Sequence, residues 1–324
     1  MGGGSTGAGL VGRERELADL VALLDDASAG RGGLALLVGE AGIGKSRLAA
    51  EVAATASPRG FYVGWGRAWE GGGAPPYYPW ARALEAVGAP APDTAAATAV
   101  DSDAARFQLF RRVADGLVRL AGQAPVLLIL DDLHAADTSS LRMLSFVARE
   151  LHGTRVAIIG TRRDLDPAMT PEAEALLARV GREGRVHMLG RLEEAAVARL
   201  VRAQLPDALA APIWAATRGN PLFVGEIVSL LAADPEKARA GEIPIPYTVR
   251  DLVRQRAEPL GAPARRLLEV AALFGGEPDP ALLAQTLGED VVAIGAALER
   301  SGLVVVHAGG RLAFSHGLTR DAVC

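Results

Sequence analysis

One stretch of eight residues constrains the fold of this chain more than any other: GEAGIGKS, residues 39–46. It follows the wholly apolar run Leu34–Val38, which has the pattern of a buried strand, and it precedes a helical segment from Arg47 to about Thr55. A strand, a glycine-rich turn and a helix in this order are the context in which the pattern G-x-x-x-x-G-K-[ST] holds phosphate. We therefore expect an α/β domain with an anion site at this turn.

The residue types of this loop suit phosphate groups. Its three glycines let the backbone curl so that N–H groups point inward, and these donors join the N-terminus of the next helix in one anion site. The lysine offers a compact, mobile charge to the β- and γ-phosphates, and the serine hydroxyl can ligate Mg²⁺. The alternative is an ordinary strand-to-helix turn, which the flanking elements disfavour. The candidate residues are Gly39, Gly42, Ile43, Gly44, Lys45, Ser46 and Arg47.

The rarity of lysine in this chain supports a specific role for the lysine of the loop. The chain has 34 basic residues, and only Lys45 and Lys237 are lysines. Such a skew toward arginine is typical of a GC-rich genome, so a retained lysine indicates a place where arginine does not serve.

Over the first 190 residues, short apolar runs alternate with stretches of helical pattern. The segment from Arg13 to about Ala29 has the spacing of an amphipathic helix. Runs that are apolar at every position are typical of parallel strands covered on both faces, and their alternation with helices predicts an α/β domain. The expected strands are Leu34–Val38, Phe61–Val63, Val126–Leu130, Val156–Ile159 and Val186–Leu189.

Two acids follow the third of these strands, in VLLILDDLHAAD, residues 126–137. Asp131 can hold Mg²⁺ through water, and Asp132 is placed to orient or deprotonate an attacking water. The alternative is an Asp-Asp turn that caps the next helix. Many active ATPases carry Glu at the second position, so a shorter Asp predicts slow hydrolysis.

The strand signal stops after Gly190. Short helices are expected over 192–233, with interruptions at Pro206, Pro212 and 219–221, and residues 234–246 have the composition of a linker. Thr248–Asp251 matches a capping box, which predicts a helix start at this point. Helices at about 249–259, 263–274, 279–287 and 290–301 and a hairpin over 303–315 then suggest a winged helix.

Composition excludes several classes of protein. The net charge of −4 gives no whole-molecule case for nucleic-acid binding, although a local basic patch remains open. No run reaches the roughly 18 apolar residues of a membrane span, and the N-terminus has no secretory pattern. The single cysteine is Cys324, so no internal disulfide or cysteine-based zinc site is expected. We expect a cytoplasmic protein without a membrane partner.

Six elements in order resemble the STAND ATPases, the signalling branch of the AAA+ proteins, and in particular the ATPase region of large bacterial LuxR-type regulators of the MalT kind. The elements are LVGRERELADL (10–20), GEAGIGKSRL (39–48), LDDLHAAD (130–137), IIGTRRD (158–164), RGNPLFVGEI (218–227) and FSHGLTRDAV (314–323). The family often has Trp where Ala135 stands. The resemblance implies the fold of a P-loop NTPase with a parallel sheet, followed by an α-helical lid and a winged-helix domain.

The resemblance also implies roles for single residues. Backbone near Val11 and Gly12 would hold adenine, Pro221 would pack on it, Arg162 would lie near the γ-phosphate, and His316 would reach the β-phosphate of ADP. Each has a plainer alternative. Arg162 or Arg163 can be a solvated charge after a strand. Pro221 can open a helix, and His316 can bond backbone at the end of the hairpin.

The expected organisation is a flexible N-terminus (1–9), a nucleotide-binding domain (10–190), a lid with linker (191–243) and a winged helix (244–324). The resemblance implies a switch that binds ADP, ATP and Mg²⁺ and self-associates in the ATP state, with DNA contacted through an output domain beyond this chain. The alternative is an Orc-type ATPase whose winged helix grips duplex DNA, although residues 279–301 are acidic rather than basic. A metabolic kinase or transporter ATPase fits poorly, because no LSGGQ-like signature occurs.

Overall fold

The described chain divides into two compact units. We call Arg13–Asp164 with Ala168–Gly190 the sheet unit, and Met1–Gly12, Leu165–Pro167 and Arg191–Cys324 the helical unit. The computed structural model describes residues 10–69, 73–92, 103–164, 166, 169–274, 278, 280–287, 290–307, 310–314 and 317–323.

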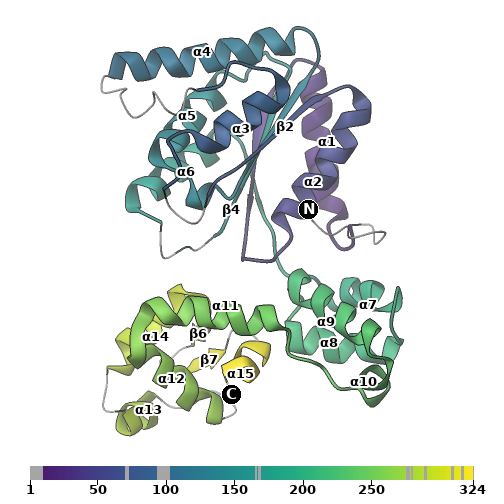
Figure 1. Cartoon of the computed structure of the whole chain (residues 1–324), viewed down its shortest axis with the longest axis vertical. Helices are drawn as coiled ribbons and strands as arrows, with labels where there is room; N and C mark the ends of the chain where they lie inside the picture. The colour runs from purple at the N-terminus through teal and green to yellow at the C-terminus, as the bar shows by residue number, and fades with distance from the viewer. Residues whose placement is uncertain are drawn as a thin grey trace. The chain divides into compact units, whose positions relative to one another are not determined.

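A sheet of five parallel strands forms the centre of the sheet unit (Figure 1). Its order is β2-β3-β4-β1-β5, so one strand separates the strand before the glycine-rich loop from the strand before the acidic pair. All the carboxyl ends lie at the same edge because every pairing is parallel. All five expected strands are present: β1 Gly33–Val38, β2 Tyr62–Arg67, β3 Val126–Asp131, β4 Val156–Arg162 and β5 Arg185–Met188.

Helices cover both faces of this sheet. Figure 1 shows α1 and α2 on one side and α3, α4, α5 and α6 on the other. The covering explains why β3 is buried at every position and β1 at all but its first. The bounds are α1 Glu14–Ser28, α2 Lys45–Ala56, η1 Ser57–Arg59, α3 Tyr78–Val87, α4 Asp103–Ala121, η3 Leu133–Ala135, α5 Thr138–Arg149 and α6 Pro171–Arg182.

The strand β2 extends four residues beyond the expected run, through Gly64, Trp65, Gly66 and Arg67. Two glycines weaken a strand signal in a sequence, but here the packing of α3 requires them. A Cβ atom on Gly64 would lie 2.2 Å from the carbonyl oxygen of Ala83, and one on Gly66 would lie 1.7 Å from that of Pro79. The close approach of α3 therefore depends on the absence of side chains at these two positions.

The helical unit contains two hydrophobic clusters. The first gathers residues of α7, α8, α9 and α10, and the second gathers residues of α11 to α15 with a two-stranded antiparallel hairpin. The bounds are α7 Glu194–Arg202, η4 Asp207–Leu209, α8 Ala210–Thr217, α9 Pro221–Ala233, α10 Pro235–Ala240, α11 Tyr247–Ala257, η5 Glu258–Leu260, α12 Gly261–Leu273, α13 Pro280–Leu287, α14 Val291–Arg300, β6 Val304–Val306, β7 Leu312–Phe314 and α15 Gly317–Val323.

Three local expectations about this unit are wrong. The expected linker contains α10, whose N-cap Asp234 accepts a hydrogen bond from the backbone N–H of Lys237. Pro212 lies inside the first turn of α8, where a missing N–H costs little, so it does not interrupt a helix. The helix start expected from the pattern at 248–251 lies elsewhere, because α11 begins at Tyr247, directly after Pro246.

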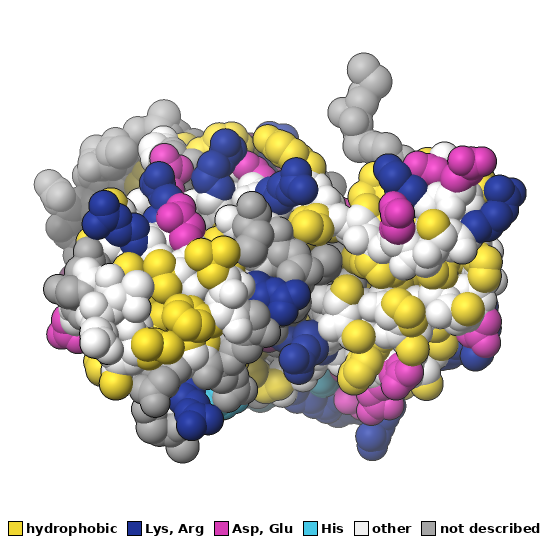
Figure 2. Space-filling view, turned by 90° about the horizontal axis from the view of Figure 1, so that it is seen from below, with side chains coloured by type: hydrophobic (Ala, Val, Ile, Leu, Met, Phe, Trp, Pro, Cys, Tyr) yellow, Lys and Arg dark blue, Asp and Glu magenta, His cyan; other side chains and the backbone are white. Residues whose placement is uncertain are grey.

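The exposed surface mixes side chains of different kinds. On the face drawn in Figure 2, hydrophobic side chains lie between Lys or Arg and Asp or Glu side chains. No single helix in the described part of the chain is long and apolar enough to cross a membrane. One sharply bent pair, Pro280–Leu287 with Val291–Arg300, meets the criteria of length and composition alone.

The packing of α3 on β2 yields a first prediction. Gly66→Ala should lower the free energy of unfolding by about 2 kcal/mol or more, because the new methyl group overlaps the backbone of Pro79 and overpacking typically costs about 1–3 kcal/mol. The matched control is Gly190→Ala, since a Cβ atom there meets nothing within 4 Å. Urea unfolding of both variants measures the difference, and equal midpoints would contradict this account of β2.

Candidate functional site

The glycine-rich loop joins the end of β1 to the start of α2. Gly42 and Gly44 adopt positive φ angles of 75° and 99°, which favour glycine. Gly39 needs the same residue type for another reason, because a Cβ atom there would lie 2.7 Å from the carbonyl oxygen of Leu189. Gly44 is the N-cap of α2, so the first N–H groups of α2 have no partner within the helix and face the loop. This backbone is shaped for an anion.

The side chain of Lys45 lies within the loop. Only 7% of the residue is exposed, and its Nζ donates hydrogen bonds of 2.8 Å to the carbonyl oxygens of Gly39 and Glu40. Burial lowers the pKa of Lys45 to about 8, although the nearby carboxylate of Asp132 acts in the opposite direction. The loop therefore keeps a positive charge that has lost much of its hydration, and an anion would stabilise that charge.

Arg13 connects this loop to the end of β5. Its guanidinium is buried, and it donates to the carbonyl oxygens of Ile43, at 3.3 Å, and Gly190. Glu16 pairs with the same guanidinium at 3.1 Å. The side chain of Ile43 is itself in the core, so this residue serves the loop through its main chain. Arg47, by contrast, is exposed on α2.

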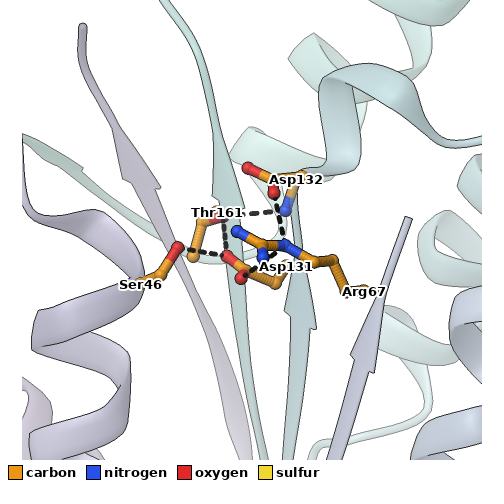
Figure 3. Close-up of polar contacts among 5 residues, drawn as sticks. All are labelled: Ser46, Arg67, Asp131, Asp132 and Thr161. Carbon is orange, nitrogen blue, oxygen red and sulfur yellow. Dashed lines mark hydrogen bonds and ion pairs between the residues drawn. The ribbon is translucent and has the colours of Figure 1, made fainter. Parts of the chain in front are cut away.

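A buried carboxylate lies beside the loop, at the end of β3 (Figure 3). Asp131 is 2% exposed, and its Oδ1 accepts hydrogen bonds from the hydroxyls of Ser46, at 2.8 Å, and Thr161, at 2.6 Å. The serine belongs to α2 and the threonine to β4, so the carboxylate joins three elements of the sheet unit. The structure thus brings Lys45, Ser46 and Asp131 together, as the sequence predicted.

The neighbouring Asp132 has a different environment. Its backbone is left-handed, with φ 58°, and its N–H donates to the hydroxyl of Thr161 at 2.9 Å. Its carboxylate accepts a hydrogen bond of 2.7 Å from Nε of Arg67, which also lies 3.4 Å from Asp131. The two acids therefore share a counter-ion at the end of β2, as Figure 3 shows.

Arg162 ends β4 beside the loop, where its carbonyl oxygen accepts from the N–H of Gly39 at 3.4 Å. Its Nε is buried, and no group among the described residues accepts its proton. Unpartnered buried donors are rare, so this guanidinium is suited to an additional anion.

Four of the predicted site residues do not belong to the sheet unit. Val11, Gly12 and Pro221 belong to the helical unit. There, Val11 packs in the cluster around α7 to α9, and Pro221 opens α9 after the N-cap Asn220, which is the plainer role expected for it. His316 lies outside the described residues. The nucleotide roles of these four residues stay predictions.

Sequence reasoning missed three residues of this site. Arg13 stands in the LVGRE segment, but its contact with Gly190 joins residues 177 positions apart. Arg67 was missed because β2 was expected to end at Val63. Thr161 lies next to the predicted Arg162. The only sequence signal for it was a hydroxyl group within a strand expected to be buried, because such a hydroxyl needs a hydrogen-bond partner.

The contacts of Arg13 generate a second prediction. Arg13→Met keeps an apolar stem of similar length but leaves the carbonyl groups of Ile43 and Gly190 without this donor. Unfolding free energy should fall by about 1–3 kcal/mol, the usual cost of an unsatisfied buried acceptor. Arg15→Met is the control, because Arg15 is an exposed residue of α1, the helix that Arg13 precedes as N-cap. Thermal unfolding by calorimetry compares them, and equal loss in both variants would count against the role of Arg13.

Comparison with known proteins agrees with this geometry. Residues 9–159 match the family model described as AAA ATPase domain. No curated protein matches the chain. Among solved structures, a Walker-type ATPase of Pyrococcus abyssi is 13% identical with a TM-score of 0.65, and the match covers 97% of this chain and 96% of that one.

Two further solved structures have lower scores. The Orc1 protein of Aeropyrum pernix, in complex with DNA, is 18% identical with a TM-score of 0.51, over 97% of this chain and 92% of that one. A signal transduction ATPase with numerous domains from Pyrococcus horikoshii, which has a tetratricopeptide repeat sensor, is 16% identical with a TM-score of 0.42, over 97% of this chain and 42% of that one. Residues 9–159 are therefore similar to AAA ATPase domains, and the chain has an α/β fold similar to those of the Walker-type ATPase and of Orc1.

Proposed function

We propose that the chain binds ATP and ADP with Mg²⁺ and acts as a slow ATPase and signalling switch. The observation that carries the proposal is the buried Lys45 beside the bond between Ser46 and Asp131. One positive charge, a ring of backbone N–H groups and an oxygen pair then lie at the same edge of the sheet. A triphosphate with its cation needs these three kinds of group.

The oxygens of Ser46 and Asp131 fit Mg²⁺. This cation prefers oxygen ligands and usually takes only one or two from the protein, with the rest from water and substrate phosphates. Within the described residues, no three His, Cys, Asp or Glu side chains form a metal site by themselves. The cation would neutralise charge on the phosphates, while Ser46 and Asp131 hold their positions through the hydrogen bond between them.

The environment of Asp132, the proposed partner of the attacking water, supports slow turnover as part of this proposal. Its carboxylate is bonded to Arg67 at 2.7 Å, so it must leave or share this partner before it can orient a water molecule. The shorter side chain of Asp relative to Glu adds to the effect. Arg162, with its unpartnered Nε, is the proposed contact of the γ-phosphate.

The role as a switch rests on the resemblance to STAND regulators of the LuxR and MalT kind. We assign the lid to residues 191–243 and the winged helix to 244–324, with Val11, Gly12 and Pro221 at the adenine. His316 would hold the closed, ADP-bound state, and ATP would favour self-association. The same resemblance supports the role of a bacterial transcription regulator in the cytoplasm.

DNA binding through the winged helix is the second candidate, because the Orc1 structure of similar fold is a complex with DNA. Arg250, Arg265 and Arg266 are exposed on α11 and α12, but other features of the surface do not favour it. Arg254 of α11 is bonded to Asp251 at 2.6 Å, and exposed hydrophobic residues such as Leu273 and Val292 lie on α12 and α14. A duplex-binding face is instead strongly positive.

The pKa of Lys45 leads to a prediction about pH. Without ligand the pKa is about 8, and a bound phosphate raises it, so ATP binding above pH 8 should take up as much as one proton. Affinity should fall by as much as about tenfold per pH unit above 8, since the free site is then neutral. Calorimetry at pH 7 and pH 9 in two buffers with different ionisation enthalpies measures the uptake.

Lysine variants complete this test. Lys45→Ala should lose most ATP binding, because one charge contacts two phosphates in a partly dehydrated site. Lys237→Ala is the matched control, since it removes the other lysine of the chain from an exposed helix. Unchanged affinity in Lys45→Ala, or a binding heat independent of buffer at pH 9, would refute the assignment of this lysine.

The two acids should separate binding from turnover. Asp132→Asn keeps a side chain that tolerates left-handed backbone, so MgATP affinity should persist while hydrolysis falls by at least about tenfold. Asp131→Asn keeps a hydrogen-bond acceptor for Ser46 but removes the charge near the cation, so Mg²⁺-dependent affinity should fall. Calorimetry and phosphate release give the two readouts. Parallel changes in both variants would mean that the acids do not have separate roles.

A further inference from the structure

A groove on the sheet unit lies apart from the phosphate loop. It encloses about 620 Å³ and is lined by residues of α4, α5 and α6, which cover the face of the sheet opposite α1 and α2 (Figure 1). None of the residues that form the candidate nucleotide site lines it. The groove is therefore a separate surface feature of the same unit.

The lining follows the same spacing on all three helices, i, i+3, i+4 and i+7. Each helix thus turns one complete stripe, about 10 Å long, toward the groove. On α5 and α6 the charged residues stand at the two ends of the stripe, whereas on α4 they precede two phenylalanines. They are Asp103, Arg106, Phe107 and Phe110 on α4, Arg142, Ser145, Phe146 and Arg149 on α5, and Glu172, Ala175, Leu176 and Arg179 on α6.

Aromatic rings form the floor. The ring of Phe146 meets that of Phe107 edge to face, with centroids 5.6 Å apart, and that of Phe110 at 5.8 Å. Phe110 is buried, but Phe107 remains 50% exposed although its ring packs against Phe146. An apolar ligand side chain placed on Phe107 would remove this surface from water.

Arginines form the rim. Four of them line the groove against two carboxylates, in a chain whose acidic residues outnumber its basic ones. Three of the four are ion-paired: Arg106 with Asp103, Arg142 with Glu172 at 2.6 Å, and Arg149 with Glu183 at 2.9 Å. Arg179 is exposed and has no ion-pair partner among the residues described for this unit. The rim therefore retains positive charge that a ligand can meet.

We propose that this groove binds an acidic amphipathic helix of a partner protein. An apolar aromatic centre within a rim of exposed arginine is the anatomy of a protein interface, in which aromatic residues and arginine supply most of the affinity. A small anion would instead need buried donors, whereas here the side chains of Arg142 and Arg149 are 41% and 56% exposed. The length and spacing of the three stripes match a helix of two to three turns, laid with its apolar face on Phe107 and its carboxylates toward the arginines.

The probe is a fluorescein-labelled 16-residue peptide with Leu or Phe at i, i+3, i+4, i+7 and i+11 and with Glu and Ala elsewhere. A second peptide replaces each Glu by Lys. Fluorescence anisotropy with the full chain should give at least about tenfold tighter binding of the acidic peptide, and this preference should shrink at high salt. Equal affinity for the two peptides overturns the proposal.

Each of two groove variants, Phe107→Ser and Arg179→Glu, has a matched control variant on α4 outside the groove. Phe107→Ser removes a half-exposed apolar side chain, and Val118→Ser removes another that is 46% exposed. Arg179→Glu and Arg119→Glu each reverse the charge of an exposed arginine. The groove variants should weaken binding of the acidic peptide by about tenfold, while both controls keep wild-type affinity and all four keep the melting temperature within a few degrees.

Three results would overturn the proposal. One is loss of peptide binding in the control variants to the same extent as in the groove variants. Another is wild-type affinity in both groove variants. The third is self-association in analytical ultracentrifugation that Phe107→Ser abolishes, because the occupant of the groove would then be a second copy of this chain.

Discussion

The sheet unit depends on one buried carboxylate. Asp131 is almost completely removed from water, and such a charge is tolerated only when hydrogen bonds replace its hydration. The hydroxyls of Ser46 and Thr161 provide that replacement from α2 and β4. The same bonds fix the start of α2, and therefore the glycine-rich loop before it, against the ends of two strands. The requirement to satisfy one acid thus positions both halves of the candidate site.

Much of the sheet could be predicted, because β1, β3 and β4 are buried on both faces and their sequences are apolar without interruption. The glycine-rich loop and Asp131 could be predicted as well, since each immediately follows such a run. The end of β2 could not. Its Gly64 and Gly66 are explained by the close packing of the α3 backbone, which the local sequence does not reveal, and Arg67 was missed with them.

Local signals also failed where longer-range packing decided the outcome. The capping-box pattern at 248–251 predicted a later helix start, but α11 starts at Tyr247, directly after Pro246. The charged residues of α10 resembled a linker, yet Asp234 caps a short helix there. Arg13 shows the opposite case: its sequence neighbourhood was recognised, but its two carbonyl partners lie in segments that only the folded sheet brings together.

The left-handed backbone of Asp132 limits how this site can vary in evolution. Asp, Asn and Gly accept a φ near 58°, whereas other side chains in that conformation cost about 1–2 kcal/mol. Replacing Asp132 by the longer Glu would therefore destabilise the turn after β3 unless the backbone of this turn changed at the same time. The turn after β3 therefore restricts which acidic residue this position can hold.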